Sequence, residues 1–337
     1  MMIKNKKIEK IVLLGGGNVL INISLWLIKK NIPVKVITSL RHSEEVIDGL
    51  KFSCLLAKNN IPFLITEDVS SVKSIDFIGD TENVFALSLG AAWIFKKTFI
   101  KNVFNDLLFN VHSTRLPQNR GGGGFSWQVM NGSRFGFCQL HLIDGGIDTG
   151  PLVLSEEFLY PQYCRIPFDF EQVLQEKNFN FIKKFILKIW EKPLDIQISP
   201  QAEYFSTYWP RLNTDINGWI DWNYSVTDLE RFICAFDDPY AGAQSCINGK
   251  EVRIKKVSVD CSDGIFHSYQ RGIVYRKNDD WICVASIGGS LIIEGLEDQE
   301  ANKILSEVNV GDRFITPTVK LEKAFGRVVY TPNGLKT

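Results

Sequence analysis

The sequence has no excess of charge of either sign, because its 38 lysine and arginine residues equal its 38 aspartate and glutamate residues. Such a chain has no overall field that would draw it to nucleic acid or to an anionic membrane surface. We therefore predict no nucleic-acid partner and no membrane partner. The balance shifts along the chain, since residues 1–200 hold 23 of the 38 basic and 19 of the 38 acidic residues, which leaves 15 basic against 19 acidic in residues 201–337.

The seven cysteines are scattered and include no C-x-x-C pair. Their odd number and spacing exclude a disulfide framework, and the missing pairs exclude a structural zinc site of the usual type. A reducing cytoplasm is the simplest location for such a chain, and we predict no metal. Histidine is also rare, with four residues in all.

One long uncharged run, residues 11–28, follows a basic start and has the features of a signal peptide or a membrane helix. It contains three adjacent glycines and two asparagines, and no small-residue cleavage site follows it. We therefore expect a buried strand at 8–14, a glycine turn at 15–17 and a helix at 18–30.

Strand and helix patterns then alternate. Apolar strands are expected at 32–39, 61–66, 83–90 and 107–113, with a helix at 43–60. This order predicts an α/β fold, a Rossmann-like parallel sheet with helices on both faces. The turn LGGGN lacks the G-x-G-x-x-G spacing, and the next strand ends without an acid, so a nicotinamide cofactor is disfavoured.

A change in composition, from alternating apolar strands and helices to an aromatic and turn-rich sequence, marks a second domain. The amphipathic helix at 169–192 closes the first domain, so we place one domain at 1–197 and another at 198–337. The second begins with an aromatic linker and a helix at 226–236. Short strands at 251–259, 271–277, 280–287 and 290–297 follow, which predicts a smaller, mostly β domain, a small antiparallel barrel.

The stretch FNVHSTRLPQNRGGGGFSW carries the chemistry. Asn110 and His112 stand at i and i+2 on a strand end, so their side chains point to one side. The glycine-rich turn LIDGGIDTG follows with Asp144 and Asp148. An amide, an imidazole and a carboxylate together suit acyl transfer, because they stabilise an oxyanion and relay protons. Ser113 would point to the opposite face, so direct transfer fits better than a covalent intermediate.

Other interpretations of these residues stay open. A single histidine on a strand end is often only structural, and IDTG also occurs in aspartic proteases, although one copy in a β-α pattern does not suit them. His141 is expected to pack within its strand, and His42 and His267 carry no pattern.

The ordered elements of residues 109–153 resemble formyltransferases that use N10-formyltetrahydrofolate. They are Asn-x-His, LP, RG, Trp, NG and H-x-I-D-x-G-I-D-T-G. STYWPRL, GWIDW and PYAGAQSCINGK are similar to the start of the C-terminal domain in methionyl-tRNA and amino-sugar formyltransferases, so the resemblance covers about residues 8–250. Ser113 and Arg115 depart from the common H-P-S-L-L-P.

The resemblance implies a formyltransferase catalytic domain at 1–197 with N10-formyltetrahydrofolate as co-substrate. Asn110 and His112 would hold the oxyanion, and Asp148 would keep the charge of the histidine and assist proton transfer. The segment 91–95 and the loop 144–147 would line the pterin pocket. The expected folate-binding residues are Ala92, Trp93, Ile94, Phe95, Arg115, Leu116, Pro117, Asp144, Gly145, Gly146 and Ile147.

Three acceptors remain open. The resemblance favours a nucleotide-linked amino sugar, as in enzymes that supply N-formylated sugars for surface polysaccharides such as a bacterial O-antigen. Methionyl-tRNA is the second, although the acidic C-terminal part suits tRNA phosphates poorly. A formyltetrahydrofolate hydrolase or a binding protein is the third. Trp209 could stack on the nucleotide base, and Arg211 could bind the diphosphate. The strands in the last ~80 residues could pair between two subunits as a homodimer as easily as form a barrel within one chain.

Overall fold

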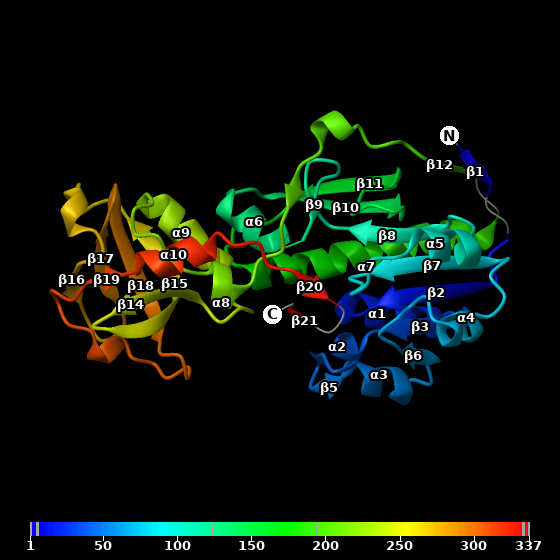
Figure 1. The fold of residues 1–337 in the computed structure, drawn as a ribbon, viewed down its shortest axis with the longest axis horizontal. Coiled ribbons are helices and arrows are strands. Elements are labelled where there is room, and N and C mark those ends of the chain that lie inside the picture. Colours follow the sequence, from blue (N-terminus) through cyan, green and yellow to red (C-terminus); the bar gives the residue numbers. More distant parts are fainter. Residues whose placement is uncertain (1, 5–6, 123, 193–194, 332–333, 336–337) are drawn as a thin grey trace.

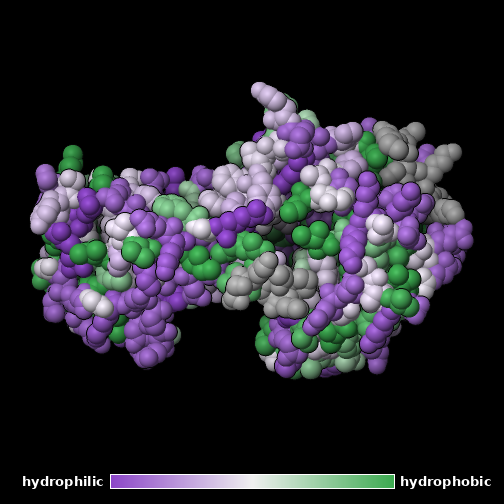
Figure 2. Space-filling view, viewed as in Figure 1, coloured by the Kyte–Doolittle hydropathy of each residue, from purple (hydrophilic) through white to green (hydrophobic). Residues whose placement is uncertain are grey.

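The computed structural model describes residues 2–335 except 5–6, 123, 193–194 and 332–333. The molecule is elongated, with a larger part built on a seven-stranded sheet and a smaller part built on a six-stranded sheet at the other end (Figure 1). On the face shown in Figure 2, hydrophobic residues are scattered among hydrophilic ones, and a hollow lies near the middle. No helix in the described part of the chain is long and apolar enough to cross a membrane.

The larger sheet has the strand order β11-β10-β8-β7-β2-β3-β6. Its five parallel strands are β2 (Lys10–Gly15), β3 (Val34–Thr38), β6 (Phe63–Ile65), β7 (Val84–Leu89) and β8 (Leu108–His112). Its remaining strands, β10 (Phe135–Leu142) and β11 (Leu152–Leu159), run antiparallel. The predicted parallel sheet is therefore correct for five strands. The loop 143–151 is too short for the crossover that a parallel β10–β11 pair would need.

Two apolar cores cover the two faces of this sheet, as predicted. Ile11 and Leu13 pack in the first core with α1 (Gly17–Lys29), α3 (Phe52–Lys58) and α7 (Pro167–Glu191). Val12 and Leu14 pack in the second with α4 (Val72–Ile78) and α5 (Lys97–Phe104). Alternate residues of β2 thus face opposite cores, which is why its sequence is apolar throughout.

The predicted helix at 43–60 is wrong in its first half. The chain forms a short helix α2 (Leu40–Ser43), a hairpin of β4 (Val46–Ile47) and β5 (Leu50–Lys51), and only then α3. Asp48 and Gly49 both have positive φ, which is the conformation that an Asp-Gly hairpin turn requires. The local turn chemistry of these two residues outweighs the helical pattern around them.

The smaller sheet has the order β16-β17-β18-β15-β14-β19 and is antiparallel. Its strands are β14 (Ala243–Ile247), β15 (Lys250–Asp260), β16 (Val274–Lys277), β17 (Ile282–Ser286), β18 (Gly289–Glu297) and β19 (Phe314–Ile315). The backbone N–H of Phe314 donates to Gly272 at 2.9 Å, so the two edges of the sheet meet. This curled sheet agrees with the predicted small barrel, while β14 and β19 were not predicted.

The remaining described elements are short or lie outside the two large sheets. They are β1 (Met2–Lys4), β9 (Arg120–Gly121), α6 (Gly124–Met130), β12 (Asp195–Gln197), β13 (Tyr208–Trp209), α8 (Thr214–Asn217), α9 (Val226–Ala235), α10 (Thr318–Ala324), β20 (Tyr330–Thr331), β21 (Gly334–Leu335) and the single turns η1 (Glu203–Phe205), η2 (Ser268–Gln270) and η3 (Leu305–Glu307). The hydroxyl of Ser126 on α6 donates to Ala235 on α9 at 2.9 Å. The domain boundary at residue 197 stays a prediction.

Candidate active site

A cavity of about 520 Å³ lies at the carboxyl ends of β7 and β8. Asn110, His112 and Asp148 all line it, so the three residues singled out by the sequence lie together. Asn110 and His112 occupy alternate positions of β8, and their side chains share one face of the strand. Ligands of open α/β sheets bind at this edge, where the loops after the strands leave room.

His112 is held from one side by a loop that follows it. Its Nε2 lies 2.8 Å from the carbonyl oxygen of Asn119 and 2.7 Å from the hydroxyl of Thr114, and that hydroxyl donates to the same carbonyl at 2.7 Å. Since a carbonyl only accepts hydrogen bonds, Nε2 carries a proton. The other nitrogen, Nδ1, faces Asp148 Oδ1 at 3.7 Å. The ring therefore exposes Nδ1 to the reacting side.

His141 is a site residue that the sequence analysis treated as strand packing. It is 2% exposed, and its Nδ1 donates to the carbonyl of Leu142 at 2.8 Å. Its Nε2 then accepts from Asn110 Nδ2 at 3.0 Å and lies 3.7 Å from Asp148 Oδ1. Burial lowers the pKa of His141, and the charge of Asp148 opposes that shift. A neutral His141 fixes the amide of Asn110 and leaves its second N–H for a ligand.

Asp148 reaches the site by a route that the sequence did not indicate. Because β10 is antiparallel, its end at Leu142 pairs with Phe109, and the loop 143–151 must turn back to bring Asp148 beside His112. Asp148 has a φ of 54°, a left-handed conformation that aspartate tolerates better than most residues. Its Oδ2 accepts from the backbone N–H of Gly121 at 3.0 Å.

Two further residues hold this loop. Gln201 donates through Nε2 to the carbonyls of Asp148 at 2.8 Å and Gly150 at 2.7 Å, and its Oε1 accepts from the buried guanidinium of Arg120 at 3.1 Å. Gly121 has a φ of 98°, and a β-carbon there would collide with the carbonyl oxygen of Trp209. Sequence reasoning missed Gln201, because no local pattern shows that the segment after residue 198 returns to this loop.

The expected folate-binding residues divide between several places. Trp93, Ile94, Phe95, Asp144, Gly146 and Ile147 line the cavity. Ile94 is 76% exposed and Ile147 is 42% exposed, so two apolar side chains are available to a flat ligand. Within the described ranges, Ala92 and Gly145 do not line this cavity.

The remaining expected residues lie outside this cavity. Leu116 is buried and donates its N–H to Gln139 Oε1 at 2.6 Å, and the carbonyl of Pro117 accepts from Thr207 at 3.2 Å. Arg115 and Trp209 line a second cavity, whereas Arg211 lines the first. The structure thus separates Trp209 from Arg211.

The first cavity is also lined by two arginines and by the carboxylate of Glu45. Arg41 and Arg211 both line it, and within the described ranges neither guanidinium forms an ion pair with a carboxylate. Desolvation lowers the pKa of Arg41, and the nearby charge of Arg211 adds to that effect. His42 is 4% exposed and accepts at Nε2 from Arg41 at 2.8 Å, and burial followed by the two arginines lowers its pKa to about 4. The two arginines can bind an anion.

No group of three or more His, Cys, Asp or Glu side chains suited to a metal ion occurs among the residues that the structure describes. The polar groups that line the cavity include the amide of Asn110, three imidazoles, three carboxylates and two guanidinium groups. Such a set can polarise a carbonyl, stabilise an oxyanion and move a proton.

Comparison with known proteins supports the fold and the formyltransferase class. Residues 214–309 match the family model for the formyl transferase C-terminal domain. The methionyl-tRNA formyltransferase of Rickettsia bellii is 24% identical over 210 residues, which cover 62% of this chain and 64% of that protein. The bifunctional polymyxin resistance protein ArnA of Wigglesworthia glossinidia brevipalpis is 24% identical over 288 residues, 81% of this chain and 41% of that protein.

Solved structures share the fold. WlaRD, a sugar 3N-formyl transferase crystallised in the presence of dTDP and 5-N-formyl-THF, has a TM-score of 0.63 at 22% identity and covers 86% of this chain and 97% of its own. The N-formyltransferase of Helicobacter canadensis, in complex with folinic acid and dTDP-3-aminofucose, gives the same TM-score of 0.63 at 22% identity and covers 85% and 98%. Residues 214–309 thus match a formyl transferase domain, and the chain shares the fold of the solved sugar N-formyltransferases. The aligned region spans a little under two thirds of the curated methionyl-tRNA formyltransferases.

Proposed function

We propose that this protein transfers a formyl group from N10-formyltetrahydrofolate to the amine of a nucleotide-linked amino sugar. The observation that carries the proposal is one cavity lined both by Asn110, His112 and Asp148 and by the arginines Arg41 and Arg211. The first group suits formyl transfer, and the second suits an acceptor that carries phosphate. The proteins of similar fold bind a formyl folate and dTDP or a dTDP-linked sugar.

The reaction follows from the contacts of the three residues. The amine nitrogen attacks the formyl carbon, and the carbonyl oxygen becomes an oxyanion that the free N–H of Asn110 and a protonated His112 Nδ1 would stabilise. Asp148 would accept the proton that the amine loses and favour the cationic imidazole. Collapse of the intermediate breaks the bond between the formyl carbon and N10, and N10 takes up a proton. The product is an N-formyl sugar and tetrahydrofolate.

The folate would lie against the apolar side of the cavity. Ile94 and Ile147 expose hydrophobic surface there, and Trp93 is fixed by a hydrogen bond from Nε1 to the carbonyl of Glu67 at 2.9 Å. Asp144 and Gly146 form a turn in which Asp144 Oδ1 accepts from Gly146 N–H at 2.9 Å. A flat pterin fits a wall of this kind, where apolar faces alternate with backbone groups.

The diphosphate of the acceptor would lie between Arg41 and Arg211. Arg41 is partly desolvated, and an arginine so placed makes strong paired hydrogen bonds to phosphate oxygens. The nearby α1 begins at Gly17 with no acidic residue in its first turn and no side-chain cap. The carboxylate of Glu45, which also lines the cavity, accepts a hydrogen bond from the backbone N–H of Gly17, so a phosphate would share this helix end with a carboxylate.

A second candidate is methionyl-tRNA, because several curated relatives carry that activity in their names. The acceptor end of tRNA would have to approach along the C-terminal part. Residues 201–337 hold 15 basic and 19 acidic residues, because residues 1–200 hold 23 of the 38 basic and 19 of the 38 acidic residues. Such a surface attracts phosphate weakly. The amino sugar is therefore the better supported acceptor.

The test supplies N10-formyltetrahydrofolate with a panel of dTDP-, GDP- and UDP-linked 3-amino and 4-amino sugars and measures tetrahydrofolate release. We expect release to depend on one sugar, whose mass increases by one formyl group. Release without any sugar would identify a hydrolase instead. Release only with methionyl-tRNA would transfer the assignment to the second candidate.

A variant tests the arginines. Changing Arg211→Gln should raise the KM for the nucleotide sugar by roughly tenfold, because it removes a charged hydrogen-bond donor, and leave the KM for the folate unchanged. Arg271→Gln is the matched control, since Arg271 is an exposed arginine of the smaller part. If the two variants change the KM for the nucleotide sugar equally, Arg211 does not bind the acceptor.

A further inference from the structure

The segment 325–331 returns from the smaller part of the molecule toward the larger part. In Figure 1 it follows α10 and runs back along the middle of the molecule to β20, which lies near α1. The amide of Asn217 fixes its start, because Nδ2 donates to the carbonyls of Ala324 at 2.7 Å and Gly326 at 3.1 Å. Val328 is buried, so the segment packs against the rest of the chain.

Tyr330 in this segment contacts Arg211, one of the two arginines that line the first cavity. The Cζ atom of the Arg211 guanidinium lies 4.3 Å from the centre of the Tyr330 ring. The Tyr330 hydroxyl accepts from Asn213 Nδ2 at 3.2 Å and donates to the carbonyl of Leu212 at 3.4 Å. The ring is therefore held by the same stretch of chain that carries Arg211, and it lies against the guanidinium.

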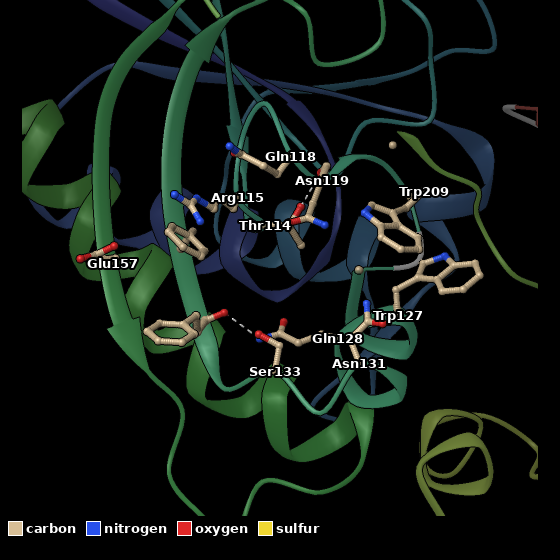
Figure 3. A pocket seen from close by; sticks show the side chains of 15 residues that line it. Thr114, Arg115, Gln118, Asn119, Trp127, Gln128, Asn131, Ser133, Glu157 and Trp209 are labelled. Atoms are coloured by element: carbon tan, nitrogen blue, oxygen red, sulfur yellow. Dashed lines mark hydrogen bonds between the residues drawn. The ribbon is translucent and has the colours of Figure 1, made fainter. Parts of the chain in front are cut away.

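The residues before Arg211 anchor its main chain. The carbonyl of Pro210 accepts from Trp127 Nε1 at 2.8 Å, and the rings of Trp127 and Trp209 lie 4.9 Å apart. Both indoles line the second cavity, which has a volume of about 370 Å³ (Figure 3). The main chain beside Arg211 is thus fixed by contacts at the second cavity, and Tyr330 holds the side chain that reaches the first.

Arg211 needs such support to bind an anion. It is exposed, and within the described ranges it forms no ion pair with a carboxylate. A long side chain without a partner samples many rotamers, and ordering it when a ligand binds costs affinity. An aromatic ring contacts the face of a guanidinium and leaves the N–H donors at its edge free. The contact with Tyr330 therefore orders Arg211 without using the groups that would bind phosphate.

We propose that Tyr330 is a positioning residue of the acceptor site, where it orders Arg211 for a phosphate group of the nucleotide-linked substrate. This inference rests on the proposed function, since it concerns the place where the diphosphate would bind. The acceptor site then includes a residue of the segment that follows α10, far along the chain from Arg211. Loss of the Tyr330 ring should weaken nucleotide binding through Arg211 alone.

Isothermal titration calorimetry on the full chain with dTDP, GDP and UDP, each alone, measures the Kd of the nucleotide without turnover. We expect the wild type to bind at least one of the three, and Tyr330→Leu to raise that Kd by roughly fivefold or more, because the guanidinium loses the ring. Tyr330→Phe keeps the ring and should bind within about twofold of the wild type. Tyr269→Leu is the matched control, because it removes a ring that lies 4.8 Å from the Arg313 guanidinium in the smaller part, and it should leave the Kd unchanged.

A double variant shows whether Tyr330 acts through Arg211. If it does, Arg211→Gln and Arg211→Gln/Tyr330→Leu should have the same Kd, because no guanidinium is left for the ring to order. A purely structural role of Tyr330 would instead make the double variant weaker than Arg211→Gln by the factor that separates Tyr330→Leu from the wild type. That result would overturn the proposal.

The other outcomes separate this inference from the proposed function. A wild type that binds none of the three nucleotides would contradict both. If the wild type binds a nucleotide and Tyr330→Leu binds it equally well, only the role of Tyr330 is wrong. If Tyr330→Phe binds as weakly as Tyr330→Leu, the hydroxyl and not the ring is what matters, and the proposal is again wrong. Circular dichroism shows whether each variant folds, and if Tyr330→Leu does not, a chain that ends at Val329 replaces it in the same comparisons.

Discussion

The two cavities that share Gly121 and Gly122 are lined by different kinds of side chain. The first contains histidines, carboxylates and arginines, among them His42, His112, His141, Asp148 and Arg211. The second contains mainly indole, amide and hydroxyl groups. In the first, Asn110, His112, His141 and Asp148 lie in contact or close to one another. Among the described residues, Arg41 Nε and His42 Nδ1 of the first cavity and Trp209 Nε1 and Gln118 Oε1 of the second have no hydrogen-bond partner.

This difference separates the groups that react from the groups that support them. Groups that hold each other in place are preorganised to stabilise charge that develops during a reaction. The second cavity contributes Thr114 and Asn119, which hold Nε2 of the histidine. His112 lies between the two, since its Nδ1 faces Asp148 and its Nε2 faces the loop that lines the second cavity. Substitutions in the first cavity should therefore alter turnover directly, whereas substitutions at the wall of the second should alter it through His112.

The largest effect is expected in the first cavity. His112→Asn or Asp148→Asn should reduce kcat by roughly 100-fold or more, because each removes a group that stabilises the oxyanion or moves the proton. Folate affinity should stay close to wild type, which equilibrium titration would check. A near-normal turnover number in either variant would refute the assigned roles.

A smaller effect is expected at the wall between the cavities. Thr114→Val removes the hydroxyl that lies 2.7 Å from His112 Nε2 and should lower kcat by roughly five- to tenfold with little change in the folate KM. Thr114→Ser keeps the hydroxyl and should restore most of the rate. If serine is as poor as valine, the methyl group of Thr114 matters for packing and the hydroxyl does not orient His112.

The smallest effect concerns stability against pH. Burial and two arginines lower the pKa of His42 from its ordinary value of 6.5 to about 4, so the folded protein resists protonation that the unfolded chain accepts. The free energy of unfolding contributed by a neutral His42 is complete above pH 6.5 and is lost as the pH falls toward 4. The slope from this residue reaches at most about 1.4 kcal/mol per pH unit.

Denaturant unfolding between pH 7 and pH 4 measures that slope. His42→Gln should flatten it, whereas His267→Gln, at an exposed position of the smaller part, should leave it unchanged. His141 is also buried with a lowered pKa, so part of the slope will persist in the His42 variant. An identical slope in the wild type and His42→Gln would show that His42 is not held neutral by the fold.

Several features could be predicted from sequence alone because they depend on local pattern. Runs of apolar residues with turn residues between them indicated the parallel strands, and the i and i+2 spacing put Asn110 and His112 on one face of β8. The glycine-rich turn indicated Asp148. The hairpin at Asp48 and Gly49 also has a local signature, which the longer helical pattern around it concealed.

Other features depended on contacts between distant segments. His141 contacts Asn110, and Gln201 contacts the Asp148 loop, although each pair is far apart in the chain. Trp209 and Arg211 are near neighbours in the chain but line different cavities. Burial, which sets the neutral state of His141 and of His42, likewise comes only from packing. The sequence by itself determined the catalytic groups and the strand on which two of them stand. Only the tertiary structure decided their partners, their protonation and the existence of a second cavity, because hydrogen bonds, desolvation and enclosed space arise only when distant segments pack together.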